Sequence, residues 1–143
     1  MSSESTTTQL SIPLPRSLDT RIHIHLTTKS KAVTLFLTSV TQDEQSGPAA
    51  LGSFVYALPN RLDPAQPIST AIYSVESTLE FATRMAKLLA KRTNIPVYVG
   101  CSISLGGSAM GLSVEEEMEA FRAIVDVVTE KLKGGQAAIN GVS

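Results

Sequence analysis

NIPVYVGCSISLGGSAMGLSVEEEMEAFRAIVDVVTEKLK spans residues 94–133, and its hydrophobic pattern changes period partway along. In the first part, apolar side chains alternate with small or polar ones at Val97, Val99, Cys101 and Ile103, which predicts a strand over 97–103. The pair Gly106-Gly107 predicts a hairpin turn, because glycine supplies the positive φ that two-residue turns require. Residues 108–112 are then long enough to form a further short strand.

The second part of this stretch has the pattern of an amphipathic helix. Ser113 and Glu116 have the spacing of a capping box, which satisfies free N–H groups at the start of a helix. Gly134 stands where a glycine is expected to end the helix, so residues 134–143 are expected to form a flexible C-terminal tail. Apolar residues at steps of three and four predict one buried helix face, made of Met118, Phe121, Val125, Val128 and Leu132.

The upstream residues predict partners for this strand and helix. Residues 19–28 and 32–40 alternate with strand period around a short polar connection, so we expect a hairpin. Residues 51–58 carry apolar groups on both faces, which indicates a strand that is covered on each side. Residues 68–74 predict a short flanking strand with Ile68 and Ile72 inward, and the periodicity over 75–92 predicts another amphipathic helix.

These elements indicate an α+β fold and a dimerising module. We expect about six strands in a mostly antiparallel sheet, with two amphipathic helices. A length of 143 residues fits one domain. Residues 1–12 are rich in Ser and Thr and have little to bury, so they are expected to be a flexible N-terminal tail, which leaves 13–133 as the single domain.

The composition favours a soluble protein that binds other proteins. A net charge of −1 gives no basic footprint for nucleic acid. Charged residues make up only 17% of the chain, so part of the surface is expected to be apolar and covered. A single cysteine rules out an intrachain disulfide, and neither a signal-peptide pattern nor an apolar run of ~18 residues occurs. We therefore expect a protein of the cytoplasm or nucleus, with no membrane partner.

The residues that could carry chemistry favour structural roles. The glycine-rich segment 104–111 could hold a phosphate, but it lacks Gly-Lys-Ser/Thr and precedes three glutamates, so a hairpin is favoured. Residues 100–104 lack the closing glycine of a nucleophile elbow, and Cys101 lies on the apolar face of its strand, which favours a packed thiol. His23 and His25 share a strand face, but too few other ligands exist for a metal site. We expect no catalytic residue, no cofactor and no metal.

Two sets of residues could bind other proteins. If both helices cover one sheet face, a second subunit is expected on the other face, at a partner interface of Phe36, Phe54, Tyr56, Tyr98, His23 and His25. The second set is a basic ridge on the first helix, made of Arg84, Lys87, Lys91 and Arg92. Two interpretations of the ridge stay open. It is either a solvated face whose cations complement the helix dipole, which is favoured, or a docking patch for an acidic partner.

A family resemblance gives these patterns a specific context. Residues 67–92, PISTAIYSVESTLEFATRMAKLLAKR, run on through TNIPVYVGCSISL into VEEEMEAF. With the paired segments IHIHLTT and AVTLFLTSV, they resemble the proteasome assembly chaperone 4 family, including its fungal members, over about residues 19–133. The resemblance implies a non-enzymatic chaperone that pairs with a similar subunit, proteasome assembly chaperone 3. It also implies binding of an α-subunit to promote building of the 20S α-ring. Our own hypothesis is that exposed loops and the basic ridge make the contact with that α-subunit.

Two other classes stay open at the level of sequence. A small dimeric α/β adaptor of the roadblock or longin type would use a similar module in signalling or trafficking. A small transferase would use the glycine-rich segment. Co-purifying proteins would discriminate the adaptor, and thermal stabilisation by nucleotides or acyl donors would indicate the transferase.

Overall fold

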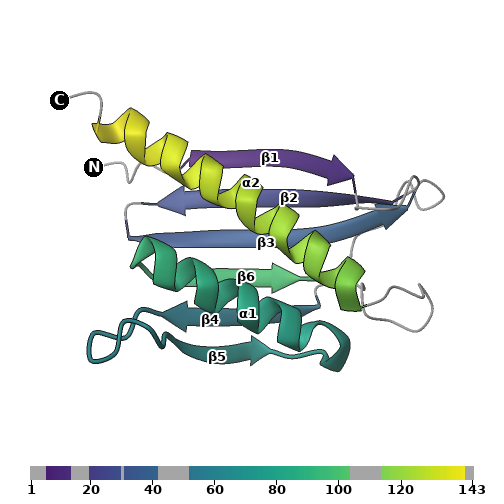
Figure 1. Ribbon diagram of the computed structural model, residues 1–143, viewed down its shortest axis with the longest axis horizontal. Helices are drawn as coiled ribbons and strands as arrows, with labels where there is room; N and C mark the ends of the chain where they lie inside the picture. Colours follow the sequence, from purple (N-terminus) through teal and green to yellow (C-terminus); the bar gives the residue numbers. More distant parts are fainter. Residues whose placement is uncertain (1–5, 14–19, 30, 42–51, 104–113, 141–143) are drawn as a thin grey trace.

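The computed structural model describes residues 6–13, 20–29, 31–41, 52–103 and 114–140. Six strands and two helices follow one another along these residues (Figure 1). In chain order they are β1 (Thr6–Pro13), β2 (Thr20–Lys29), β3 (Ala32–Thr41), β4 (Ser53–Leu58), β5 (Ile68–Tyr73), α1 (Glu76–Thr93), β6 (Val97–Cys101) and α2 (Val114–Asn140).

The strands form one sheet in the order β1-β2-β3-β6-β4-β5, and both helices lie across the same face of it (Figure 1). Among the described strands, β3 and β6 pair in parallel, and the other neighbouring pairs are antiparallel. This arrangement confirms the predicted α+β fold with a mostly antiparallel sheet. Because β6 is inserted between β3 and β4, the strand of the segment 94–133 lies in the middle of the sheet.

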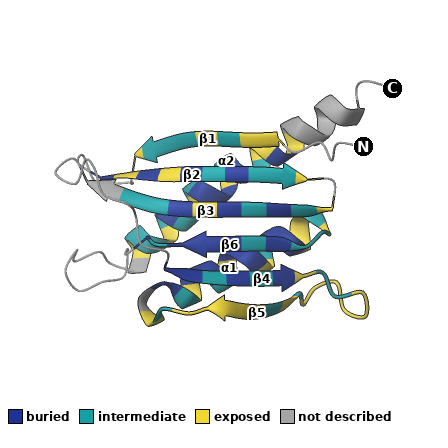
Figure 2. Ribbon diagram, turned by 180° about the vertical axis from the view of Figure 1, so that it is seen from behind, coloured by how far each residue is buried: buried dark blue, intermediate teal, exposed yellow. Residues whose placement is uncertain are grey.

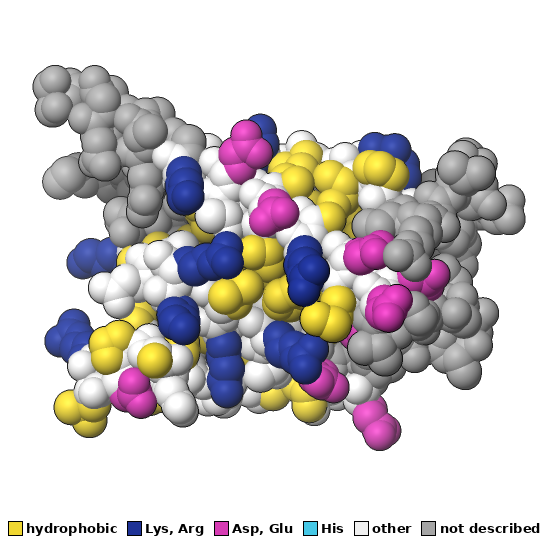
Figure 3. Space-filling view, viewed as in Figure 1, with side chains coloured by type: hydrophobic (Ala, Val, Ile, Leu, Met, Phe, Trp, Pro, Cys, Tyr) yellow, Lys and Arg dark blue, Asp and Glu magenta, His cyan; other side chains and the backbone are white. Residues whose placement is uncertain are grey.

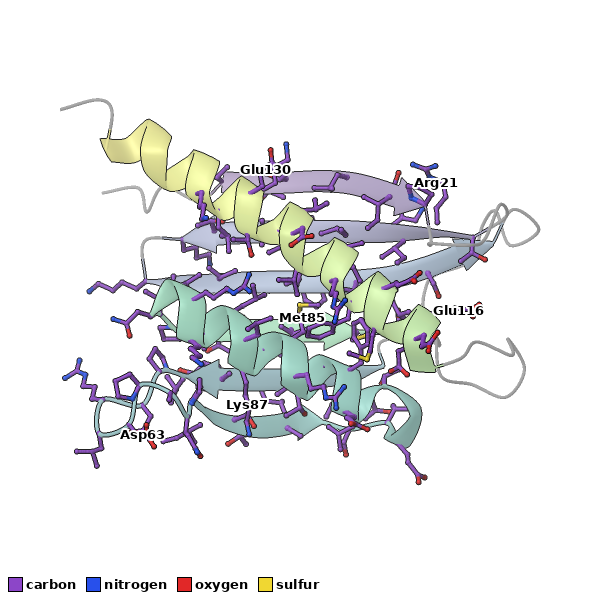
Figure 4. The ribbon with its side chains drawn as sticks, viewed as in Figure 1. Arg21, Asp63, Met85, Lys87, Glu116 and Glu130 are labelled. Atoms are coloured by element: carbon purple, nitrogen blue, oxygen red, sulfur yellow. The ribbon has the colours of Figure 1, made fainter. Side chains whose placement is uncertain are left out.

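The hydrophobic core fills the space between the sheet and the helices. Along β2, buried residues alternate with more exposed ones, as a strand with one covered face requires (Figure 2). Met85 of α1 lies beneath its helix at the centre of the core and is 0% exposed (Figure 4). Full burial of each large apolar side chain contributes about 1.5–3 kcal/mol, so this layer supplies most of the stability. The strand side chains of the core are Ile22, Ile24, Leu26, Val33, Leu35, Leu37, Val55, Ala57, Val97, Val99 and Cys101.

Small residues hold the corner between β4 and the start of α1. Val75, the N-cap residue, provides no side-chain cap, but its N–H donates to Oγ of Ser53 at 2.9 Å. The N–H of Ser53 donates in turn to Oγ1 of Thr78 at 3.0 Å. A Cβ on the preceding Gly52 would overlap the carbonyl oxygen of Cys101, so only glycine allows this close approach of two backbones. The corner thereby fixes α1 against the middle of the sheet.

Both predicted tails are wrong where the structure describes them. Residues expected in the N-terminal tail form β1, which pairs with β2 from Thr6 opposite Thr28 to Pro13 opposite Arg21. Threonine favours strands, and the few apolar side chains of this segment, Leu10 and Ile12, pack against the core. At the other end, α2 continues through residue 134 to Asn140. An established helix adds residues readily, and the Gln and Ala that follow the glycines favour helix.

Three further expectations differ from the structure or lie outside it. The glycine turn at 106–107, the strand over 108–112 and the Ser113 cap fall in residues 104–113, outside the described residues. Ile68 and Ile72 are 54% and 57% exposed rather than inward, because β5 is an edge strand. Met118 is 44% exposed, although Val125, Val128 and Leu132 of its stripe are buried as predicted.

Candidate partner interface

An aromatic row crosses the sheet face that the helices leave uncovered. Its rings come from four neighbouring strands and each contacts the next. The ring centroids of His25 and Phe36 are 6.3 Å apart, and those of Phe36 and Phe54 are 5.9 Å apart. The row continues from Phe54 to Tyr98 at 5.9 Å and from Tyr98 to Tyr56 at 4.4 Å. We call these five residues the aromatic row.

Strand alternation and register build the row. Phe36 on β3 and Phe54 on β4 both pair with Gly100 of β6, from opposite sides. Because Gly100 has no side chain, the two rings stack across it, with their planes 3° from parallel. Tyr56 and Tyr98 are direct cross-strand partners, which explains the short distance between their rings. The row is therefore a product of the β3-β6-β4 order.

The aromatic row is only partly buried within this chain. Phe36 is 36% exposed, and the other four residues of the row are partly buried. Partial desolvation, and secondarily the neighbouring Tyr98, raise the pKa of Tyr56, so its hydroxyl stays a neutral hydrogen-bonding group at physiological pH. A row of half-exposed Phe and Tyr with neutral polar tips has the chemistry of the centre of a protein interface.

Three residues that were not predicted as interface residues extend this face toward β5. Leu58 pairs with Ile68, and Phe54 pairs with Tyr73, so these side chains share the face of the aromatic row. Leu58, Ile68 and Tyr73 are 36%, 54% and 54% exposed. The alternation of Phe54, Tyr56 and Leu58 is visible in the sequence and could have identified Leu58, whereas Ile68 and Tyr73 require the register of β5.

Of the two histidines predicted at the partner interface, only His25 belongs to the aromatic row. His25 stacks on Phe36 and belongs to the row. His23 is exposed beside a shallow hollow lined by Ser11 of β1 and Thr38 of β3. Among the described residues, no group of three or more His, Cys, Asp or Glu is placed to hold a metal ion.

Cys101 lies on the opposite side of the sheet from both histidines. It is 0% exposed among the core residues that face the helices, as predicted for a packed thiol. Burial raises the pKa of Cys101 from 9.0 to about 11, so the reactive thiolate does not form at neutral pH. A Cys–His nucleophile is therefore incompatible with this fold.

The basic ridge lies on the helix side of the molecule, away from the aromatic row. Arg84, Lys87 and Lys91 are exposed on α1, and Arg84 forms an ion pair with Glu80 at 3.3 Å. Lys87 points away from the core into solvent (Figure 4). Arg92 differs from the others, because its Nη1 donates to Oγ1 of Thr129 on α2 at 3.3 Å. The structure thus brings together three of the four predicted ridge residues.

Comparison with known proteins places this geometry in a family. A family model for proteasome assembly chaperone 4 matches residues 21–103, more than half of the chain. The chain belongs to the proteasome assembly chaperone 4 family. The matched residues include the whole aromatic row, His23 and the basic ridge, and membership favours the chaperone over the adaptor and transferase alternatives.

A solved structure shares the fold of this chain beyond the residues that the family model matches. The chain resembles one chain of the crystal structure of a chaperone complex for yeast 20S proteasome assembly, with a TM-score of 0.65 and 18% sequence identity. The similarity covers 90% of this chain and 98% of that chain, so the two share one fold. Curated protein sequences give no match. No helix within the described residues has the length and apolar character needed to cross a membrane.

Proposed function

We propose that this protein is a non-enzymatic chaperone of 20S proteasome assembly. It pairs through its aromatic sheet face with a similar small subunit of the proteasome assembly chaperone 3 type. The pair binds a 20S α-subunit and promotes building of the α-ring. The observation that carries the proposal is the aromatic row on an uncovered sheet face, in a chain of the proteasome assembly chaperone 4 family.

The size of the uncovered face supports a stable partner. Six strands at a spacing of about 4.8 Å give a face roughly 29 Å wide. Strands of 5 to 10 residues are about 17–33 Å long, so the face measures on the order of 700 Å². A standard-size interface buries about 800 Å² on each partner. The face is therefore close to the area of about 600–1,000 Å² that each partner buries in interfaces of this class.

The shape of this face favours a partner with a sheet of its own. Two sheets can pack face to face, with side chains that interdigitate at a spacing of about 10 Å. The stacked rings offer a nearly continuous apolar strip, with tyrosine hydroxyls available to bond polar groups of the partner. A structurally similar subunit would bury this strip with pseudo-twofold symmetry.

The opposite side of the molecule stays available when this face is covered. The basic ridge is separated from the aromatic row by the sheet and the core. One chain can therefore hold a chaperone partner on its sheet and an α-subunit on its helices. This two-sided use explains why the chain is low in charge overall but concentrates cations on α1.

A double substitution in the aromatic row tests the proposal. Phe54→Ser with Tyr56→Ser should raise the dissociation constant of the chaperone pair at least ~100-fold, because two central aromatic anchors are lost. Leu62→Ser is the matched control, since Leu62 is 98% exposed in the loop before β5. The pair is co-expressed and its mass is measured by light scattering after gel filtration. Normal pairing of the double variant would refute the assigned interface.

A further inference from the structure

A groove between α1 and α2 lies on the side of the molecule that the sheet partner does not use. Its volume is ≈ 680 Å³. Its apolar lining comes from Phe81 and Leu88 of α1 and from Met118 and Phe121 of α2. The rings of Phe81 and Phe121 meet edge to face, with centroids 5.3 Å apart, and tie the two helices together at the floor. Met118 is 44% exposed, so the lining is accessible from solvent.

Four cations and two carboxylates, Glu80 and Glu117, border this apolar lining, so cations are in excess. In the space-filling view, hydrophobic side chains gather between the two helices and Lys and Arg side chains stand around them (Figure 3). Lys87 and Lys91 line the groove from α1, and Arg122 lines it from α2. Within the described residues, none of these three cations forms an ion pair with a carboxylate, whereas the fourth cation, Arg84, is neutralised by Glu80.

The main chain around the groove determines what kind of segment can fill it. Along the walls, the N–H groups of α1 and α2 are used in helix hydrogen bonds. The remaining wall is the loop before β5, where the N–H of Gln66 donates to the carbonyl oxygen of Asp63 at 2.9 Å. The N–H of Ala65 donates to Oδ1 of Asp63 at 3.3 Å, and Pro67 has no N–H. An extended peptide would find no free main-chain N–H groups on these walls to pair with its carbonyl groups as a strand does, but a helix satisfies its own main chain.

From these observations we propose that the groove binds an acidic amphipathic helix of a partner protein. The apolar face of that helix packs on Leu88, Met118 and Phe121. Asp or Glu side chains flanking this face pair with Lys87, Lys91 and Arg122. The bound helix lies as a third helix against α1 and α2, and apolar contacts give affinity while the charges select an acidic sequence.

This inference rests on the proposed function in one respect, since the α-subunit is the protein expected to supply the helix. It changes the role of the basic ridge. Three of its four residues, Arg84, Lys87 and Lys91, line the groove and act with an apolar floor rather than as an isolated charged patch. Arg92, which bonds to Thr129, is not among the lining residues and is left out of the site.

A direct binding measurement uses the full chain and a synthetic probe. The probe is a stapled, fluorescein-labelled helix of about 16 residues, roughly 24 Å long, with leucines at steps of three and four flanked by glutamates. A matched peptide carries lysines in place of the glutamates. We expect the acidic peptide to bind at least ~10-fold more tightly than the basic one, and less tightly as salt rises. Equal binding of the two peptides would overturn the proposed charge selection.

Substitutions then locate the binding site. Met118→Asp should weaken binding of the acidic peptide at least ~10-fold, because it places a like charge on the exposed floor. Leu62→Asp also replaces an apolar side chain with Asp, at a residue that is 98% exposed and outside the lining, and should leave binding unchanged.

Nuclear magnetic resonance gives a second readout that needs no variant. In methyl-labelled protein, the peptide should shift the Met118 methyl signal and leave that of Met85, which is 0% exposed, in place.

The outcomes separate this inference from the proposed function. Capture of an α-subunit that is unaffected by Met118→Asp, with no peptide binding, would overturn the groove while the chaperone function stands. Peptide binding at the groove without capture of any α-subunit would support the groove and refute its place in the proposed function. A fatty acid is an alternative occupant of an apolar groove bordered by cations, and laurate is the probe for it. Binding of laurate at Met118, without binding of the acidic peptide, would overturn the helix as occupant.

Discussion

At the scale of single residues, Cys101 shows how the sheet separates packing from chemistry. Its neighbours along β6, Val97 and Val99, face the helices, and His23 and His25 face the other way. The alternation in the sequence is sufficient to predict a packed thiol. The same alternation predicts which side chains make up the aromatic row.

The buried thiol predicts how stability depends on pH. Because the pKa of Cys101 is about 11 in the folded chain and 9.0 without burial, the unfolded chain loses its proton first as pH rises. Stability is therefore fully present below about pH 9 and falls as pH rises toward about 11, by roughly 2–3 kcal/mol. Urea denaturation of the natural protein and of Cys101→Ala at about pH 8 and about pH 11 measures this difference. Identical pH dependence of the two proteins would contradict the raised pKa.

The contacts within the aromatic row could not be predicted in the same way. Phe36 and Phe54 stack only because Gly100 lies between them, and this depends on the insertion of β6 between β3 and β4. Strand order is set by pairings far apart in the sequence, so local periodicity carries no information about it. The sequence therefore predicts the members of the row but not their order.

At the scale of elements, β1 shows the limit of hydrophobic patterning. Its threonines and serine do not produce the alternation of apolar and polar residues that predicts a strand, yet eight residues of this segment pair with β2. Edge strands bury little, so their sequences resemble those of exposed tails. The exposed Ile68 and Ile72 of β5 are the opposite case, because apolar residues at this edge were expected to point inward.

The contribution of β1 to stability can be measured directly. Leu10 and Ile12 are partly buried against the core, so the double variant Leu10→Ala with Ile12→Ala should lower the free energy of unfolding by about 2–3 kcal/mol. The control is Thr6→Ala with Gln9→Ala, two exposed positions of the same strand, which should change it by less than about 1 kcal/mol. Chemical denaturation gives both values. An unchanged stability of the Leu10/Ile12 variant would show that β1 is not part of the folded domain.

At the scale of the whole molecule, the helix layer and the uncovered sheet face are two separate surfaces on opposite sides of the chain. The sheet presents the aromatic row, whereas the helix side presents cations around an apolar groove (Figure 3). Two surfaces of different chemistry on opposite sides suit two different partners. Substitutions on one side should therefore leave the other interaction intact.

Charge reversal on the helix side tests this separation. Lys87→Glu with Lys91→Glu should weaken α-subunit capture at least ~10-fold, because two attractive contacts become repulsive, and should leave the chaperone pair intact. The control is Lys29→Glu with Lys31→Glu, two exposed lysines at the β2–β3 connection with the same change in net charge. Both interactions are measured by biolayer interferometry with purified proteins. Equal loss of capture in the two variants would show that only net charge matters.

The most direct test of the account is affinity purification of the tagged chain from its own cells, followed by mass spectrometry. We expect recovery of one similar small subunit together with a 20S α-subunit. With Phe54→Ser and Tyr56→Ser, the small subunit should be lost, whereas Leu62→Ser should retain both proteins. Recovery of neither protein with the natural chain, or recovery of trafficking or signalling complexes in their place, would contradict it.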